Sequence, residues 1–265
     1  MPVDVNITVP NAARVYDYAL GGVHNFEADR QLWDQMERIA PDARLLARTN
    51  RQFLIRVVRW LAERGVTQFL DIGSGIPTLG NVHEAAQEVN PQARVVYVDK
   101  DPVAVQQSRS LLSGNNNALV IEGDLLDPDR IIFDPRVLEF LDFSQPVAVL
   151  VVAVLHFVED RHEPAAIISR IGAALSAGSY LVMSHVGHES TPEGRERQEL
   201  ARKLYEQTTT PLVIRDAQQL GALLDDQFEI LEPGVVPADE WRPDPEEDDE
   251  LPPQSVVLAA VALRR

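Results

Sequence analysis

Acids and glycines follow two successive apolar segments of the chain, and residues of these types suit the binding of a nucleoside. The apolar segment 67–71 ends on Asp71, and a turn with Gly73 and Gly75 follows. A second apolar segment, 94–99, ends on Asp99, which lies 24 positions after Gly75. An acid about 20 residues after such a turn commonly accepts hydrogen bonds from ribose hydroxyls. The pattern predicts a βαβ unit that binds an adenosine-containing ligand.

The composition of the glycine turn favours S-adenosylmethionine (SAM) over a dinucleotide. A dinucleotide fingerprint needs a third glycine or alanine, but this chain has Thr78, and Pro77 removes a backbone donor that could bind phosphate. Asp71 would also place a carboxylate near a pyrophosphate, whereas SAM carries a cationic sulfonium and an ammonium group and no phosphate. We therefore predict SAM as the cofactor and keep NAD as the alternative. The residues predicted to bind SAM at this turn are Asp71, Gly73, Ser74 and Gly75.

Two further turns extend the predicted cofactor site. The alternative role for Asp99 is a helix cap ahead of Pro102, for which Asp101 is better placed. An acid after Gly123 can accept a hydrogen bond from the adenine amino group, while the next backbone N–H binds a ring nitrogen. The alternative there is an Asx turn without a ligand. The residues predicted to bind SAM at these turns are Asp99, Lys100, Gly123, Asp124 and Leu125.

The segment after residues 147–152 contains the candidate catalytic residue. Residues 147–152 are wholly apolar, which is typical of a central strand in a parallel sheet. We predict that Ala153 borders the cofactor and that His156 removes a proton from an acceptor hydroxyl or amine, since an imidazole has a reference pKa of about 6.5. The alternative is that His156 holds loop geometry or packs under the ligand. His185 and His188 could face the acceptor, and no histidine and acid residues have metal-ligand spacing, so we predict no metal.

Aromatic and polar side chains cluster in residues 16–30, ahead of the predicted sheet. Gly21 and Gly22 interrupt a helical pattern there and permit unusual backbone angles. We predict that this segment covers the SAM site and shapes an acceptor pocket, with Tyr16 and Asn25 contacting the cofactor. The alternative is a docking helix whose tyrosines only pack.

Hydrophobic periodicity predicts strands that alternate with helices after residue 65. Strands are expected at 67–71, 94–99, 118–122, 147–152, 179–184, 228–232 and 256–263, and helices at 81–89, 102–112, 163–175, 193–207 and 216–224. The last two strands are expected to be antiparallel at one edge, with residues 239–253 as a solvated loop between them. We predict a helical cap of residues 1–64 and a Rossmann-like domain of residues 65–265.

Composition limits the partners of the protein. The formal net charge of −17 repels nucleic-acid backbones, so a small-molecule acceptor is expected and nucleic acid is not. There is no cysteine, and no apolar run approaches the ~20 residues that span a bilayer. The N-terminus lacks the features of a signal peptide. These properties favour a cytoplasmic protein without membrane contact, and they leave the oligomeric state open.

The order acid-x-Gly-x-Gly, Asp99 and Gly123-Asp124 resembles class I SAM-dependent methyltransferases over residues 68–265. Three further stretches are similar to a bacterial family of S-adenosyl methyltransferases across nearly the whole chain: residues 11–30, Gly-Ile-Pro-Thr with Asn81-Val-His83-Glu84, and Val-Tyr-Val-Asp-Lys-Asp-Pro. Pro77 stands where the third glycine of class I enzymes is usual, which puts the detailed loop shape in question.

This resemblance implies SAM as cofactor and an α/β fold with a doubly wound, mostly parallel, seven-stranded sheet and an N-terminal helical cap. It implies no particular acceptor. We expect a methyltransferase that acts on a small molecule by in-line transfer, which depends chiefly on alignment of the acceptor atom. A non-catalytic SAM sensor is the alternative. An NAD-dependent oxidoreductase is less favoured, because the chain lacks the third glycine and a Tyr-x-x-x-Lys group after the fourth strand.

Overall fold

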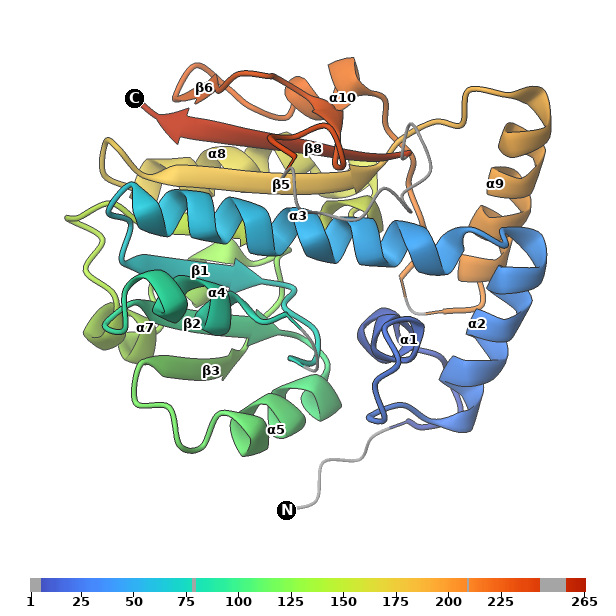
Figure 1. Ribbon diagram of the computed structural model, residues 1–265, viewed down its shortest axis with the longest axis horizontal. Helices are drawn as coiled ribbons and strands as arrows, with labels where there is room; N and C mark the ends of the chain where they lie inside the picture. The colour runs from blue at the N-terminus through green and yellow to red at the C-terminus, as the bar shows by residue number, and fades with distance from the viewer. Residues whose placement is uncertain (1–5, 78–79, 209, 244–255) are drawn as a thin grey trace.

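A mixed sheet forms the centre of the molecule in the computed structural model, which describes residues 6–77, 80–208, 210–243 and 256–265 (Figure 1). The strands run in the order β3-β2-β1-β4-β5-β8-β6, and β7 pairs with β8. Their bounds are β1 (Gln68–Ile72), β2 (Arg94–Asp99), β3 (Ala118–Glu122), β4 (Ala148–Val151), β5 (Tyr180–Val186), β6 (Phe228–Ile230), β7 (Val236–Pro237) and β8 (Val257–Arg264).

The five strands β1 to β5 pair in parallel, and β8 pairs antiparallel with β5, β6 and β7. This arrangement confirms the α/β class and the antiparallel edge expected from the sequence. The sheet has eight strands among the described residues rather than the predicted seven. The additional strand, β7, is only two residues long, so it has no alternating pattern that sequence analysis could detect.

Helices cover both faces of the sheet, because successive strand residues point to opposite sides. On β1, Phe69 packs in one buried cluster with residues of α3 and α4, while Leu70 packs in a second cluster with residues of α6, α7 and α8. The helix bounds are α1 (Ala12–Ala19), α2 (Glu27–Ile39), α3 (Ala43–Glu63), α4 (Val82–Val89), α5 (Pro102–Leu111), α6 (Pro128–Ile132), α7 (Pro135–Phe140), α8 (Pro164–Ala174), α9 (Pro192–Tyr205) and α10 (Ala217–Gly221), with short 3-10 turns η1 (Leu155–Phe157) and η2 (Asp160–His162).

The first two helices lie apart from the sheet core. Val15 of α1 and Leu32 of α2 share a third buried cluster with Leu204 of α9. Figure 1 shows α1, α2 and α9 beyond the arrowheads of β1 and β5, at the carboxyl ends of these strands. The long helix α3 instead lies along the sheet and buries Phe53 and Val57 against it. The division into a cap of residues 1–64 and a domain of residues 65–265 remains a prediction.

Most predicted elements form where expected, with end differences of one or two residues. The strands at 94–99 and 118–122 have the predicted bounds. The last predicted helix is shorter, since α10 ends at Gly221 rather than at 224. Of the predicted loop 239–253, residues 244–253 lie outside the described part of the chain. None of the helices in the described residues is long and apolar enough to cross a membrane.

Candidate cofactor and acceptor site

A cavity of about 290 Å³ lies at the carboxyl ends of the parallel strands, where ligands of doubly wound sheets bind. Turns that follow β1, β2, β3 and β4 contribute to its lining, as do α1, α2, α3 and α9. Twelve of the thirteen residues predicted for the site line this one cavity. They are Tyr16, Asp71, Gly73, Ser74, Gly75, Asp99, Lys100, Gly123, Asp124, Leu125, Ala153 and His156.

Asn25 does not line the cavity. Its side-chain amide donates to Asp17 Oδ2 at 2.9 Å and to the Gly22 carbonyl at 3.0 Å, and its Oδ1 accepts from Arg30 at 3.1 Å. Asp17 also lies so close to Gly22 that a side chain at that position would collide with its carboxylate. Asn25 therefore organises the turn between α1 and α2, and the structure gives it no contact with the cavity.

The glycine turn after β1 is held by Asp99 and closely approached by Val154. Gly73 and Gly75 have φ values of 75° and 64°, in the left-handed region that favours glycine. A Cβ on Gly73 would lie 2.5 Å from Val154 Cγ2, so only glycine lets the β1 and β4 turns meet. The Gly75 N–H donates to Asp99 Oδ2 at 2.8 Å, which links the first acidic turn to the second.

In the turn after β2, Asp101 and Asp99 take different roles, although the sequence allowed either acid to cap the following helix. Asp101 caps α5 by accepting hydrogen bonds from the N–H groups of Val103 and Ala104, at 2.6 and 3.3 Å. Asp99 instead accepts from the Asp101 N–H at 2.8 Å and lines the cavity. The helix is therefore capped without Asp99, whose carboxylate accepts from two backbone N–H groups and lines the cavity.

Two buried acids give the cofactor half of the cavity an unusual electrostatic character. Burial raises the pKa of Asp71 to about 7; the Arg51 charge opposes this rise, and Asp99 adds to it. Burial likewise raises the pKa of Asp99 to about 6, although the backbone N–H groups of Asp101 and Gly75 oppose the change. A buried carboxylate without a cationic partner is costly. A cationic ligand would relieve that cost, whereas the phosphates of a dinucleotide would add to it.

Arg51 on α3 is a cavity residue that the sequence analysis missed. Its guanidinium lies over the Tyr16 ring, 5.6 Å from the ring centre. Its Nε is buried and has no hydrogen-bond partner among the described residues. An arginine with a free donor beside buried acids suits a zwitterionic ligand such as the methionine part of SAM, whose carboxylate would bind the guanidinium. Arg51 is one of five arginines along α3, so periodicity alone could not single it out.

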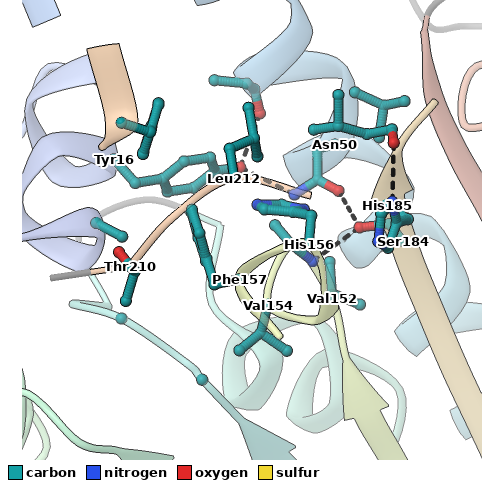
Figure 2. Close-up of a pocket in the computed structure, with 18 of the residues that line it drawn as sticks. Tyr16, Asn50, Val152, Val154, His156, Phe157, Ser184, His185, Thr210 and Leu212 are labelled. Atoms are coloured by element: carbon teal, nitrogen blue, oxygen red, sulfur yellow. Dashed lines mark hydrogen bonds between the residues drawn. The ribbon is translucent and has the colours of Figure 1, made fainter. Parts of the chain in front are cut away.

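A chain of hydrogen bonds joins α1 to the turn after β4 (Figure 2). Tyr16 donates its hydroxyl proton to the Ala47 carbonyl at 3.0 Å and accepts from Asn50 Nδ2 at 3.0 Å. Ser184 Oγ donates to Asn50 Oδ1 at 2.5 Å and accepts from the Ala153 N–H at 2.9 Å. Ala153 has a φ of 54°, which is unfavourable for a residue with a side chain. The chain therefore holds a strained backbone at the edge of the cavity.

Two histidines, His156 and His185, also line the cavity, and their environments keep both neutral. Burial lowers the pKa of His156 well below its usual value, and His185 and Arg215 lower it further. Burial also lowers the pKa of His185 to about 4. His185 Nδ1 contacts the Val186 carbonyl at 2.8 Å, which requires a proton on Nδ1, so Nε2 accepts from Arg215 at 3.0 Å. His185 has no free nitrogen, whereas His156 Nδ1 is buried without a partner among the described residues. His188 does not line this cavity.

The strand order, the antiparallel β8 and the acid–glycine turns together define the class of SAM-dependent methyltransferases with a Rossmann-like fold. A family model for S-adenosyl methyltransferases matches residues 1–265, and the chain belongs to this family. SAM is therefore its cofactor, and the residues around Asp71 and Arg51 fit that assignment. No curated protein sequence matches the chain at a significant level.

Similar solved structures agree with the family assignment. A candidate methyltransferase from Thermobifida fusca YX is 39% identical and has a TM-score of 0.90, with 100% of this chain and 98% of that chain covered. A DUF574 family protein from Streptomyces avermitilis MA-4680 is 35% identical and has a TM-score of 0.90, with 98% of this chain and 100% of that chain covered. Human N-acetylserotonin methyltransferase, solved with SAM, shares the fold at 15% identity and a TM-score of 0.50, with 89% of this chain and 57% of that chain covered.

Proposed function

We propose that the protein transfers the methyl group of SAM to a small-molecule acceptor that binds in the same cavity. The observation that carries this proposal is the continuity of the cavity. Its lining runs from the acids at the β1 and β2 turns to aromatic residues of α1, α2 and α9. A protein that only sensed SAM would not need apolar and aromatic walls beside its cofactor site. The same continuity supports a covering role for α1 and α2.

Different lining residues bind different parts of the cofactor in this proposal. Asp71 provides the negative charge that a sulfonium and an ammonium group need, and Arg51 provides donors for the carboxylate. Asp99 provides acceptors for ribose hydroxyls, while Gly123, Asp124 and Leu125 border the position expected for adenine. SAM, when bound, supplies an electrophilic methyl group. The chain's own contribution is to align the acceptor and exclude water, and alignment of this kind can lower a barrier by roughly 7–11 kcal/mol.

His156 is proposed as the group that accepts the proton, or a hydrogen bond, from the acceptor. Its neutral ring can accept that proton or a hydrogen bond from the acceptor, since the lowered pKa keeps it uncharged at neutral pH. The same lowered pKa makes it a weak base, so it assists a transfer that alignment mainly drives. We expect His156→Ala to reduce the rate far more than it reduces SAM affinity.

The test is incubation of the purified chain with methyl-labelled SAM and a bacterial metabolite extract. We expect label to appear in one or a few small molecules, and we expect no such product with Asp71→Asn, which should bind SAM poorly. Binding of SAM without any labelled product would contradict catalysis and would favour the sensor that the sequence left open.

A further inference from the structure

Apolar and aromatic side chains form a part of the cavity wall that does not belong to the turns carrying Asp71 and Asp99. They come from α2, α3, η1, α9 and the segment after α9 and are Trp33, Met36, Leu46, Phe157, Tyr205 and Leu212. We call this part, together with His156, the acceptor compartment. The rings of Phe157 and Tyr205 lie 5.7 Å apart with an angle of 34° between their planes. Walls of this kind bind flat apolar molecules, because aromatic faces stack and exclude water.

The charges of the cavity are distributed unevenly. Five charged lining residues, Arg51, Asp71, Asp99, Lys100 and Asp124, surround the predicted cofactor position. The remaining charged lining residues of the described chain are Asp42, Glu189 and Arg197, and none of them is buried. The acceptor compartment therefore offers no buried partner for an ion. An acceptor with its own charge would lose hydration there without compensation.

His156 and Tyr205 both line the acceptor compartment, and each suits a hydrogen bond with a hydroxyl group. His156 is 8% exposed, lines the cavity, and has a buried Nδ1 without a hydrogen-bond partner among the described residues. Burial raises the pKa of Tyr205 to about 12, so its hydroxyl keeps its proton and can donate. By contrast, Tyr16, Asn50 and His185 already use their polar atoms within the protein. A neutral hydroxyl can donate to an imidazole and accept from a phenol, but an ammonium or a carboxylate cannot do both.

From these observations we propose that the acceptor is an uncharged aromatic compound whose hydroxyl group faces His156. This assignment of the acceptor class rests on the proposed methyl transfer. The acceptor oxygen forms the new bond to the methyl carbon while the carbon–sulfur bond breaks. The hydroxyl proton passes to His156 and then to water, so that the products are an aryl methyl ether and neutral S-adenosylhomocysteine.

The test uses four probes of similar size: 2-naphthol, 2-naphthoate, 2-naphthylmethylamine and trans-2-decalol, the last being uncharged but not aromatic. Binding to the protein saturated with S-adenosylhomocysteine is measured by calorimetry, and methylation is measured with labelled SAM. We expect 2-naphthol to bind at least tenfold more tightly than each of the other three and to be methylated on oxygen. Equal or tighter binding of the carboxylate, the ammonium or the decalol, or no binding of 2-naphthol, would overturn the proposal.

Variants separate this proposal from a general loss of fold. Phe157→Leu and His156→Ala are each expected to weaken 2-naphthol binding at least fivefold and to leave SAM affinity within twofold. Phe133→Leu is the matched control, since Phe133 is 61% exposed and lies outside the cavity lining. Unchanged 2-naphthol binding in both cavity variants would contradict the assigned compartment.

The extract experiment distinguishes failure of the acceptor class from failure of the proposed function. If labelled products are charged or not aromatic, the acceptor class is wrong and methyl transfer stands. If SAM binds and nothing is labelled, methyl transfer itself is wrong.

Discussion

Replacement of Asp71 by asparagine is expected to weaken SAM binding by about 100-fold, or roughly 3 kcal/mol, while making the ligand-free protein more stable. The two effects have opposite signs because the carboxylate is useful only when a cation is present. In the ligand-free protein it is buried, and its pKa is raised to about 7 from the usual 3.8. Because the pKa is raised in the folded state, Asp71 contributes fully to the free energy of unfolding below its unfolded-state pKa. That contribution is lost as the pH rises through about 7.

The stabilising effect of Asp71→Asn should therefore depend on pH. At pH 8 we expect a gain of roughly 2–4 kcal/mol in the free energy of unfolding, and near pH 4 we expect almost none. Thermal and urea unfolding measure the gain, and calorimetry measures SAM affinity. Asp34→Asn removes the same charge from an exposed position on α2 and is the control. Unaltered SAM affinity in Asp71→Asn would refute the role given to this acid.

Replacement of Arg51 by methionine is expected to weaken SAM binding by about 10- to 100-fold, because a charge-assisted, paired hydrogen bond to the carboxylate is lost. The loss should be specific to that part of the ligand. The affinity for 5′-methylthioadenosine, which has the nucleoside and no amino-acid group, should change by less than threefold. Arg51→Lys should recover part of the SAM affinity, since it restores the charge without the planar pair of donors.

Arg48→Met provides the matched control for Arg51→Met, as Arg48 is an exposed arginine on the same helix. Calorimetric titrations with both ligands give the comparison. Equal losses for SAM and 5′-methylthioadenosine would indicate a general distortion of the cavity, and equal affinities in wild type and variant would exclude Arg51 from carboxylate binding.

The sequence was most informative where function depends on a short segment. The acids and glycines at Asp71, Gly73 and Asp99 could be found because each follows an apolar strand, and parallel strands end at one edge of a sheet. The structure brings them to one cavity. The helices α6 and α7 also carry a local signal, because each has proline at its first position and an acid, Asp127 or Asp134, directly before it.

Other parts of the site depend on contacts between distant segments, which no local pattern reveals. Asn50 on α3 and Ser184 on β5 are separated by 134 positions, yet a hydrogen bond between their side chains joins the two elements. Arg215 lies in a segment without regular structure, but it donates to the carbonyls of Leu155 and Val158 and to His185. Asn25 shows the opposite case: its place in a polar and aromatic cluster predicts a cofactor contact, but its amide binds Asp17 and the Gly22 carbonyl in its own turn.

A calorimetric titration of the wild-type chain with SAM and with NAD, at pH 6 and at pH 8, tests the central claim most directly. We expect SAM to bind at both values and to release protons at pH 6, where Asp71, with its pKa of about 7, is largely protonated before the cation arrives. Little proton release is expected at pH 8, and no NAD binding at either. Binding of NAD in place of SAM, or SAM binding without proton release at pH 6, would contradict the claim that the buried acid Asp71 binds a cationic cofactor.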